Sequence, residues 1–311
     1  MTGTTHADGD VTTRPTSAGT TRTEPAGTGP TDTGPTGAGL VAAAAKVAEV
    51  AAEQAEHADR DRRLGPEVVH AFVQAGFPRH FTPTRWGGTA GGFTELLHAV
   101  TIVGAACASA AWCASLAAGA SRMGVYLPEA GQRELWADGP DTLVVGALLP
   151  AGRARRADGG WRVTGSWRYT SLVDHSDWAL ACALTEPDGE PWFFALPRSA
   201  YRVVDTWDSV GMRGTGSNTL VADDVPVPDR LAFPRAAMFT GRSVGSTARC
   251  HTAGLRTVSG LLFGAPALGA ARGALAHWIA ARGAPATGPA RGGNAGPTPG
   301  GPATGSAPGG A

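Results

Sequence analysis

The sequence has almost no lysine and no excess of either charge. Lys46 is the only lysine, and the 26 basic side chains are balanced by 26 acidic ones to a formal net charge of zero. Proteins that bind nucleic acids or anionic membranes carry a clustered excess of basic side chains, so we expect neither partner. The start of the chain also lacks the pattern of a signal peptide. The longest uncharged run, residues 99–121, is mostly Ala, Ser, Gly and Cys, which predicts buried helix rather than a membrane span.

Cysteine is scarce and scattered. Cys107, Cys113, Cys182 and Cys250 form no CxxC pair and have no metal-ligand spacing with histidine, so we expect no metal site. Isolated free thiols in a chain of this size are typical of a reducing compartment. We therefore expect a cytoplasmic protein.

Large apolar side chains are missing from both ends of the chain. Val11 is the only one between residues 2 and 39, and residues 283–311 use only Gly, Ala, Pro, Thr, Ser, Arg and Asn. Such segments bury too little apolar surface to offset an ordering cost of about 1–2 kcal/mol per residue. Residues 1–40 and 283–311 are therefore predicted to be disordered tails.

Between the tails, the hydrophobic pattern changes twice. Residues 41–140 have helical periodicity and are predicted to form an N-terminal helical domain. Residues 141–232 hold six or seven short strand-like runs with turn signals at 158–159 and 188–189, which predicts a central antiparallel β-domain. Residues 233–282 are helical again but short. The sequence therefore predicts an α+β fold with an incomplete C-terminal helical region.

Four segments carry a resemblance to a known family. They are the loop 81–88 (FTPTRWGG), the helix start 107–112 (CASAAW), the run 205–218 (DTWDSVGMRGTGSN) and the strand end 225–228 (VPVP). Together with the helix–strand–helix order, these strings resemble the acyl-CoA dehydrogenase superfamily over residues 41–281.

Within that superfamily, two strings are more similar to the oxygenase components of two-component flavin-dependent monooxygenases. Residues 146–154 (GALLPAGRA) resemble the oxygenases' Pro-x-Gly-x-Ala, at the place where dehydrogenases carry Thr-Glu-Pro. Residues 167–178 resemble the oxygenase string Trp-x-x-x-Ser-Gly-x-x-His-x-x-Trp, with Leu172 in place of the glycine. A Thr-Glu-Pro string does occur at 185–187, but in a hairpin turn.

The resemblance implies a reaction and its partners. Reduced FMN or FAD would arrive from a separate NAD(P)H:flavin reductase and react with O2 to give a C4a-hydroperoxyflavin. Its distal oxygen would hydroxylate an aromatic or polyketide-like small molecule, as in secondary metabolism. The family also implies a homotetramer.

Two residues of the 167–178 string are candidate catalytic residues by this resemblance. Ser171 matches the family's flavin-contacting hydroxyl and is expected beside flavin N5, where a hydroxyl can donate or accept a hydrogen bond. His175 could act as a base, since its side chain titrates in the useful range. The structural alternatives are a serine at a strand end and a loop histidine oriented by Asp174 or Asp177.

Further candidates come from the other matched segments. Arg213, Thr215 and Ser217 could hold the flavin through a glycine-rich turn, and Trp86 and Trp112 could line an aromatic substrate pocket. The alternatives are a plain turn between strands and ordinary core packing.

Two departures from the family pattern leave other functions open. Relatives often carry a catalytic histidine where this chain has Ala120, and the family's C-terminal four-helix bundle is represented only by 258–279. We expect either a covering second chain or, as the favoured hypothesis, a frameshift in GC-rich DNA. The alternative functions are an FAD-dependent acyl-CoA dehydrogenase and a catalytically inactive truncated remnant.

Overall fold

The structure is a computed structural model that describes residues 37–283. The predicted tails at 1–36 and 284–311 lie outside the described residues. The predicted tail boundary at residue 40 is wrong, because the first helix already begins at Gly37. Leu40 is buried in the core, so tertiary packing fixes the helix start earlier than the sequence pattern indicates.

The described residues before the sheet form six α-helices. They are α1 (Gly37–Glu53), α2 (Ala55–Asp61), α3 (Pro66–Gln74), α4 (Phe93–Ala106), α5 (Ala108–Met123) and α6 (Glu129–Leu135). Cys107 has extended backbone and separates α4 from α5, so the uncharged run predicted to be buried helix is divided between two helices. Small side chains cover most of α5, so neighbouring elements pack closely around it.

Seven strands in the described part of the chain form one sheet. They are β1 (Val144–Ala157), β2 (Gly160–Thr170), β3 (Trp178–Glu186), β4 (Pro191–Pro197), β5 (Arg202–Val204), β6 (Asn218–Pro228) and β7 (Ala232–Pro234). Their order is β5-β6-β2-β1-β3-β4-β7. The hairpin predicted at 158–159 joins β1 and β2.

The prediction of a purely antiparallel sheet is wrong, because β1 and β3 pair in parallel. After β2 the chain turns through residues 171–177 and places β3 on the far side of β1, where it runs in the same direction. Strand-like runs predict extended backbone but do not specify which runs become neighbours. The sheet is therefore mixed.

Strand β1 carries an irregularity that shapes the molecule. Its pairing with β3 shifts register between Ala147 and Gly152, and Pro150 lies inside the shifted segment. Proline fits a bulge because it cannot donate a ladder hydrogen bond. Gly152 packs against the ring of Trp167, so closely that any Cβ at this position would overlap the indole. Burial of the Trp167 ring therefore requires the second glycine of the 146–154 string, Gly152.

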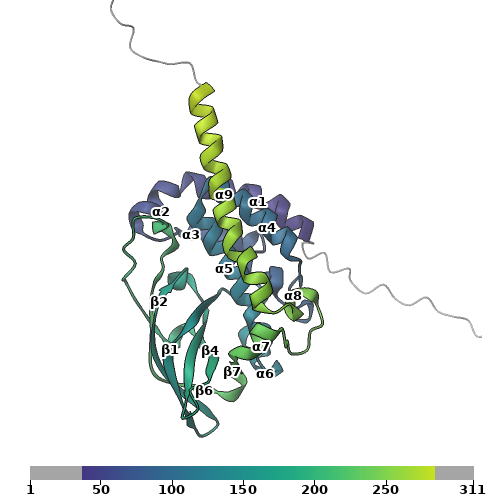
Figure 1. Ribbon diagram of the computed structural model, residues 1–311, viewed down its shortest axis with the longest axis vertical. Coiled ribbons are helices and arrows are strands. Elements are labelled where there is room, and N and C mark those ends of the chain that lie inside the picture. The colour runs from purple at the N-terminus through teal and green to yellow at the C-terminus, as the bar shows by residue number, and fades with distance from the viewer. Residues whose placement is uncertain (1–36, 284–311) are drawn as a thin grey trace, which may run out of the picture. The chain divides into compact units, whose positions relative to one another are not determined.

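Three helices follow the sheet within the described residues: α7 (Arg235–Thr240), α8 (Arg249–Thr252) and α9 (Leu255–Gly283). This confirms the helix predicted over 258–279. Figure 1 shows α9 crossing α4 and α5, the helices with which it makes its main contacts. A Cβ built on Gly104 would lie 3.0 Å from the Cα of Gly269, so the two helix backbones touch at this crossing.

The far half of α9 has little cover among the described residues. Leu275, Trp278 and Ile279 are all more than half exposed. By length and composition α9 is also apolar enough to cross a membrane, yet its first half packs on α4 and α5.

Arg122 ties the α8 segment to α5. Its guanidinium is almost fully buried and donates hydrogen bonds to the carbonyl oxygens of Cys250 and Ala253. The Tyr126 hydroxyl donates to the carbonyl of His251 at 2.9 Å. These bonds satisfy loop carbonyls that would otherwise be buried without partners, and they fix the start of α9 against α5.

Candidate active site

An apolar cavity of about 460 Å³ lies between α5, the first two strands and the start of α9. On its α5 wall the small residues Ala117, Gly119 and Ala120 alternate with the larger Trp112, Leu116 and Met123. Trp167 forms part of its sheet wall. The residues around it are Trp112, Leu116, Ala117, Gly119, Ala120, Met123, Val145, Gly146, Ala147, Leu148, Leu149, Ala151, Ser166, Trp167, Arg168, Tyr169, Ser171, Leu172, Leu255, Leu262 and Phe263. Most of these side chains are hydrocarbon, so the cavity suits an apolar ring system.

A second cavity of about 310 Å³ adjoins the first. We call it the hydroxyl cavity, and it is lined by Trp112, Tyr169, Ser171, Trp207, Met212, Thr215 and Ser217. Trp112, Tyr169 and Ser171 line both cavities. The two spaces therefore share one boundary, at which an indole, a phenol and a hydroxyl meet.

Four hydrogen bonds connect the polar groups of the hydroxyl cavity. The Trp112 Nε1–H donates to Ser171 Oγ at 3.0 Å, and Ser171 Oγ lies 2.8 Å from Ser217 Oγ. Ser217 Oγ lies 2.6 Å from Thr215 Oγ1, and the Thr215 hydroxyl donates to the Met212 carbonyl at 2.9 Å. All three hydroxyl residues are more than 90% buried.

Strained backbone positions hold these side chains in place. Tyr169, Leu172 and Met212 have φ values of 62°, 65° and 56°, which non-glycine residues rarely adopt. Leu172 stands where the resembling string has glycine, and its backbone N–H donates to the Thr215 carbonyl at 3.0 Å. Burial of its side chain and this bond stabilise the left-handed conformation.

The structure brings together four of the sequence-predicted residues. Trp112, Ser171, Thr215 and Ser217 come from three segments of the chain and meet in the hydroxyl cavity. The spacing of these residues in the sequence does not predict that they lie close together. They were predicted because the strings 107–112, 167–178 and 205–218 resemble those of the family.

Two of the predicted polar residues point elsewhere, which corrects their assignment. His175 Nε2 lies 3.0 Å from the Leu64 carbonyl, the bond of a loop histidine that fixes a turn. The Arg213 guanidinium donates to the carbonyls of Asp59 and Ser209, at 2.9 and 3.0 Å. Neither side chain lines either cavity. Both join the sheet region to segments that are distant in the sequence.

Trp86 is also placed outside both cavities. Its Nε1–H donates to Gln132 Oε1 at 3.1 Å, and its ring stacks on Trp136 with 6.5 Å between centroids. Trp86 is therefore a packing residue between the 81–88 loop and α6. Of the two tryptophans predicted to line a pocket, Trp86 lines neither cavity, whereas Trp112 lines both.

Sequence reasoning missed several cavity residues. Tyr169 and Trp207 flank the hydroxyl cavity with their rings 6.1 Å apart, and Arg168 lies at the rim of the apolar cavity with its guanidinium 5.1 Å from the Tyr169 ring. All three lie inside the strings 167–178 and 205–218. The sequence does not show which way these side chains point, because the left-handed backbone at Tyr169 interrupts the alternation of side chains along β2.

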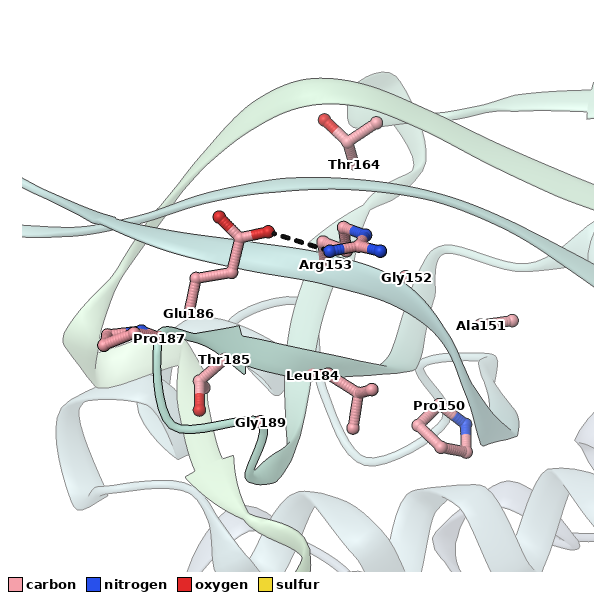
Figure 2. A pocket seen from close by; sticks show the side chains of 10 residues that line it. All are labelled: Pro150, Ala151, Gly152, Arg153, Thr164, Leu184, Thr185, Glu186, Pro187 and Gly189. Carbon is pink, nitrogen blue, oxygen red and sulfur yellow. Dashed lines mark hydrogen bonds and ion pairs between the residues drawn. The ribbon is translucent and has the colours of Figure 1, made fainter.

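A different pocket, of about 480 Å³, is lined by residues of β1, β2 and β3 and of the turn that follows β3 (Figure 2). It is lined by Pro150, Ala151, Gly152, Arg153, Thr164, Leu184, Thr185, Glu186, Pro187 and Gly189, and only Ala151 also lines the apolar cavity. Figure 2 shows Arg153 and Glu186 facing one another, with 3.4 Å between nitrogen and oxygen. Both are solvent-exposed, so this ion pair contributes little. The Thr-Glu-Pro string thus lies at the end of β3 and leads into the surface turn between β3 and β4.

Metal ligation has no support in the part of the chain that the structure describes. No group of three or more His, Cys, Asp or Glu side chains there could hold a metal ion.

The Cys113 thiol, which contacts the Thr215 carbonyl, has its pKa raised by burial. It is therefore neutral and acts as a small packing side chain.

Comparison with known proteins shows which family this chain is similar to. The family model "Acyl-CoA dehydrogenase, N-terminal domain" matches residues 40–136. The chain is 35% identical over 252 residues to the "FADH(2)-dependent resorcinol hydroxylase, oxygenase component" of Rhizobium sp. (strain MTP-10005), covering 77% of this chain and 61% of the relative. It is 31% identical to the "Flavin-dependent monooxygenase, oxygenase subunit HsaA" of Rhodococcus jostii (strain RHA1), covering 71% and 60%.

Solved structures give the same result. A crystal structure of the HsaA monooxygenase from M. tuberculosis superposes with a TM-score of 0.76 at 30% identity, covering 80% of this chain and 67% of that one. XiaF from Streptomyces sp., in complex with FADH2 and glycerol, superposes with a TM-score of 0.72 at 28% identity, covering 78% and 63%.

The chain belongs to the acyl-CoA dehydrogenase superfamily, in the group formed by the oxygenase components of flavin-dependent monooxygenases. It spans about three fifths of the length of the two curated relatives named above.

Proposed function

We propose that this chain is the oxygenase component of a reduced-flavin-dependent monooxygenase that hydroxylates an aromatic or polyketide-like small molecule. The observation that carries the proposal is the junction of the two cavities at Ser171, Trp112 and Tyr169. One cavity offers hydroxyls and aromatic faces, and the other offers hydrocarbon walls. A flavin and an apolar substrate must meet in this way for an oxygen atom to pass between them.

The residues of the hydroxyl cavity fit a flavin ring. Trp207, Tyr169 and Trp112 supply flat apolar surfaces, and Ser171 supplies a polar contact at the boundary with the apolar cavity. An isoalloxazine has an apolar face and a nitrogen-rich edge, which match these two kinds of group. When bound in reduced form, the flavin supplies activation of O2 and transfer of one oxygen atom.

The chain's own residues would bind, orient and exclude water. Ser171 would contact flavin N5, and Trp112 would hold the Ser171 hydroxyl in position. Leu262 and Phe263 cover the apolar cavity from α9, which limits access of water to the reacting atoms. Ala120 lies where relatives often carry a histidine, so this wall supplies space rather than a base.

The cofactor and partners belong to the same proposal. The names of the relatives specify FADH2 for the Rhizobium enzyme and for the XiaF complex, which supports a reduced flavin here, either FAD or FMN. A two-component system requires a separate NAD(P)H:flavin reductase, and O2 is the second substrate. All four cysteines are free thiols, which supports a cytoplasmic location.

An acyl-CoA dehydrogenase is the alternative enzyme. It needs a carboxylate to remove the substrate's α-proton, and the described residues that line the two cavities include no Asp or Glu. The described lining therefore supports an oxygenase better. Reduction of a dye by an acyl-CoA, with oxidised FAD bound, would reverse this conclusion.

One experiment tests the proposal directly. The purified chain is mixed anaerobically with reduced FMN or FAD and then exposed to ¹⁸O₂ with a panel of phenols. We expect flavin binding and one ¹⁸O atom in a hydroxylated product. The catalytically inactive remnant, the third reading of the sequence, predicts neither binding nor product.

The variant Ser171→Ala sharpens this test. Loss of the hydroxyl at flavin N5 is expected to lower the yield of product per O2 consumed about tenfold, with the remaining O2 recovered as hydrogen peroxide. Ser199→Ala removes an exposed hydroxyl that lines neither cavity and serves as the matched control. Its yield of product per O2 consumed should equal that of the unmodified chain. Equal coupling in both variants would show that Ser171 has no role in the reaction.

A further inference from the structure

The hydrogen bonds of the hydroxyl cavity have a defined direction. An indole N–H can only donate, and a backbone carbonyl can only accept. We call the chain of hydrogen bonds from Trp112 to Met212 the series. Trp112 therefore donates a hydrogen bond at one end of the series, and the Met212 carbonyl accepts one at the other end. Between them stand Ser171, Ser217 and Thr215, each with one hydroxyl proton.

Counting protons fixes the direction of every bond in between. The Thr215 proton points to the Met212 carbonyl, so Thr215 Oγ1 must accept from Ser217. The Ser217 proton is then used, so Ser217 Oγ must accept from Ser171. Among the protein's own groups, this is the arrangement in which every hydroxyl proton has an acceptor.

The direction determines what Ser171 presents to the cavity. Its proton points to Ser217, and one lone pair receives the Trp112 N–H. A second lone pair is left to face the hydroxyl cavity. Ser171 is therefore an acceptor towards a ligand, and a ligand N–H is the matching group.

This distinction separates the two redox states of a flavin. Reduced flavin carries a proton on N5 and donates there, whereas oxidised flavin has a lone pair on N5 and accepts. We propose that Thr215 and Ser217 are positioning residues that hold Ser171 as an acceptor, so that the site selects reduced flavin over oxidised flavin. This inference rests on the proposed function, because it takes flavin as the ligand.

The series can also run in the opposite direction, at a cost. Thr215 would have to release the Met212 carbonyl and donate to Ser217, which would donate to Ser171. The Ser171 proton would then point into the cavity and meet the lone pair of oxidised N5. The lost Thr215–Met212 bond opposes this reversal, so Thr215 sets the preference.

Thr215→Val removes that constraint with little change in side-chain volume. The Ser217 proton loses its acceptor at position 215 and turns to Ser171, whose own proton turns into the cavity. We expect the ratio of the dissociation constants for oxidised and reduced flavin to fall about tenfold, the usual size of one hydrogen bond. Anaerobic titration with each redox form, or the midpoint potential of the bound flavin, measures this ratio.

Thr170→Val is the matched control. Thr170 is also a buried threonine that donates to the carbonyl three residues earlier, that of Trp167 at 3.1 Å, but it has no bond to the series. The control variant should keep the redox preference of the unmodified chain. Ser217→Ala is a second test variant, because it frees the Ser171 proton without touching position 215, and it should shift the ratio in the same direction as Thr215→Val.

The outcomes separate this inference from the proposed function. A fall of the ratio in Thr215→Val and Ser217→Ala, but not in Thr170→Val, supports the directed series. Flavin binding with an unchanged ratio in both test variants overturns the inference and leaves the proposed function intact. Equal shifts in test and control variants also overturn it. If the unmodified chain binds neither redox form, both proposals fail.

Discussion

Three small residues form part of the α5 side of the apolar cavity. Ala117, Gly119 and Ala120 line the cavity near Gly146 of β1, where an added Cβ would lie 3.8 Å from the Cβ of Ala120 and 3.3 Å from Sδ of Met123. A polar or bulky residue at position 120 would project into this space. The size of the ligand is therefore controlled at single residues.

Ala120→Leu tests this control. The added methyl groups would overlap the volume that a ring occupies, so we expect the dissociation constant of the aromatic substrate to rise at least about tenfold. Flavin affinity should stay within about twofold, because Ala120 does not line the hydroxyl cavity. Substrate and flavin titrations of this variant, beside Ala120→Ser as the control, measure both effects. A parallel loss of flavin affinity would contradict the assignment of the two cavities.

The sequence could predict some of the residues that gather in the hydroxyl cavity, but neither its aromatic residues Tyr169 and Trp207 nor the direction in which the other candidates point. Ser171, Thr215 and Ser217 were found because short strings around them resemble known ones. His175 and Arg213 lie in the same strings, yet their partners are the carbonyls of Leu64 and Asp59, more than one hundred residues away. Such contacts depend on tertiary packing, which local patterns do not contain.

At the scale of elements, α9 combines a packed half with an uncovered half. Its first part meets α4 and α5, whereas Leu275, Trp278 and Ile279 are exposed. Contiguous exposed apolar side chains favour association with other protein surfaces. Among the described elements, we therefore expect the far half of α9 to bind another copy of the chain.

Substitution on this helix checks that expectation. The double variant Leu275→Glu/Trp278→Glu should lower the apparent molecular mass at micromolar concentration, because two charges on the exposed face oppose burial. A matched control is Ala45→Glu/Ala52→Glu, which adds the same charge at exposed positions of α1. Light scattering after size-exclusion chromatography reports the mass. If both variants behave like the unmodified chain, α9 does not mediate association.

Element type was easier to predict than element pairing. Periodicity and turn signals gave the order of helices and strands, including the β1–β2 hairpin. The parallel pairing of β1 with β3 was not predicted, because it depends on where the chain goes between residues 170 and 178. The bulge around Pro150 was likewise hidden, since proline in a strand run gives no direction of bending.

At the scale of the whole molecule, two buried histidines link folding to pH. His80 Nε2 lies 2.8 Å from the Gly92 carbonyl, and His251 Nε2 lies 2.6 Å from the Phe81 carbonyl. Burial lowers the pKa of both imidazoles below the ordinary value of 6.5, and the charges of Arg122 and Arg85 lower the pKa of His251 further. Burial therefore favours the neutral form of both rings in the folded chain.

The sign of the pH effect follows from these shifts. Below about pH 6.5 the unfolded chain takes up protons that the folded chain refuses, so the free energy of unfolding falls as the pH decreases. Each histidine contributes at most about 1.4 kcal/mol per pH unit. Urea unfolding at pH 7.5, 6.5 and 5.5 should show a smaller loss in His251→Gln than in the unmodified chain. His57→Gln, which changes an exposed histidine, should leave the slope as it is.

The contact between Gly104 and Gly269 has a consequence for how substrate preference can change. Because the α4 and α9 backbones touch, α9 cannot move closer to its neighbours, and Arg122 fixes the segment from which it starts. Leu262 and Phe263, which line the apolar cavity from α9, therefore cannot be brought closer to α4. A change of substrate preference is therefore expected through replacement of single side chains in the cavity wall, and not through an inward movement of α9.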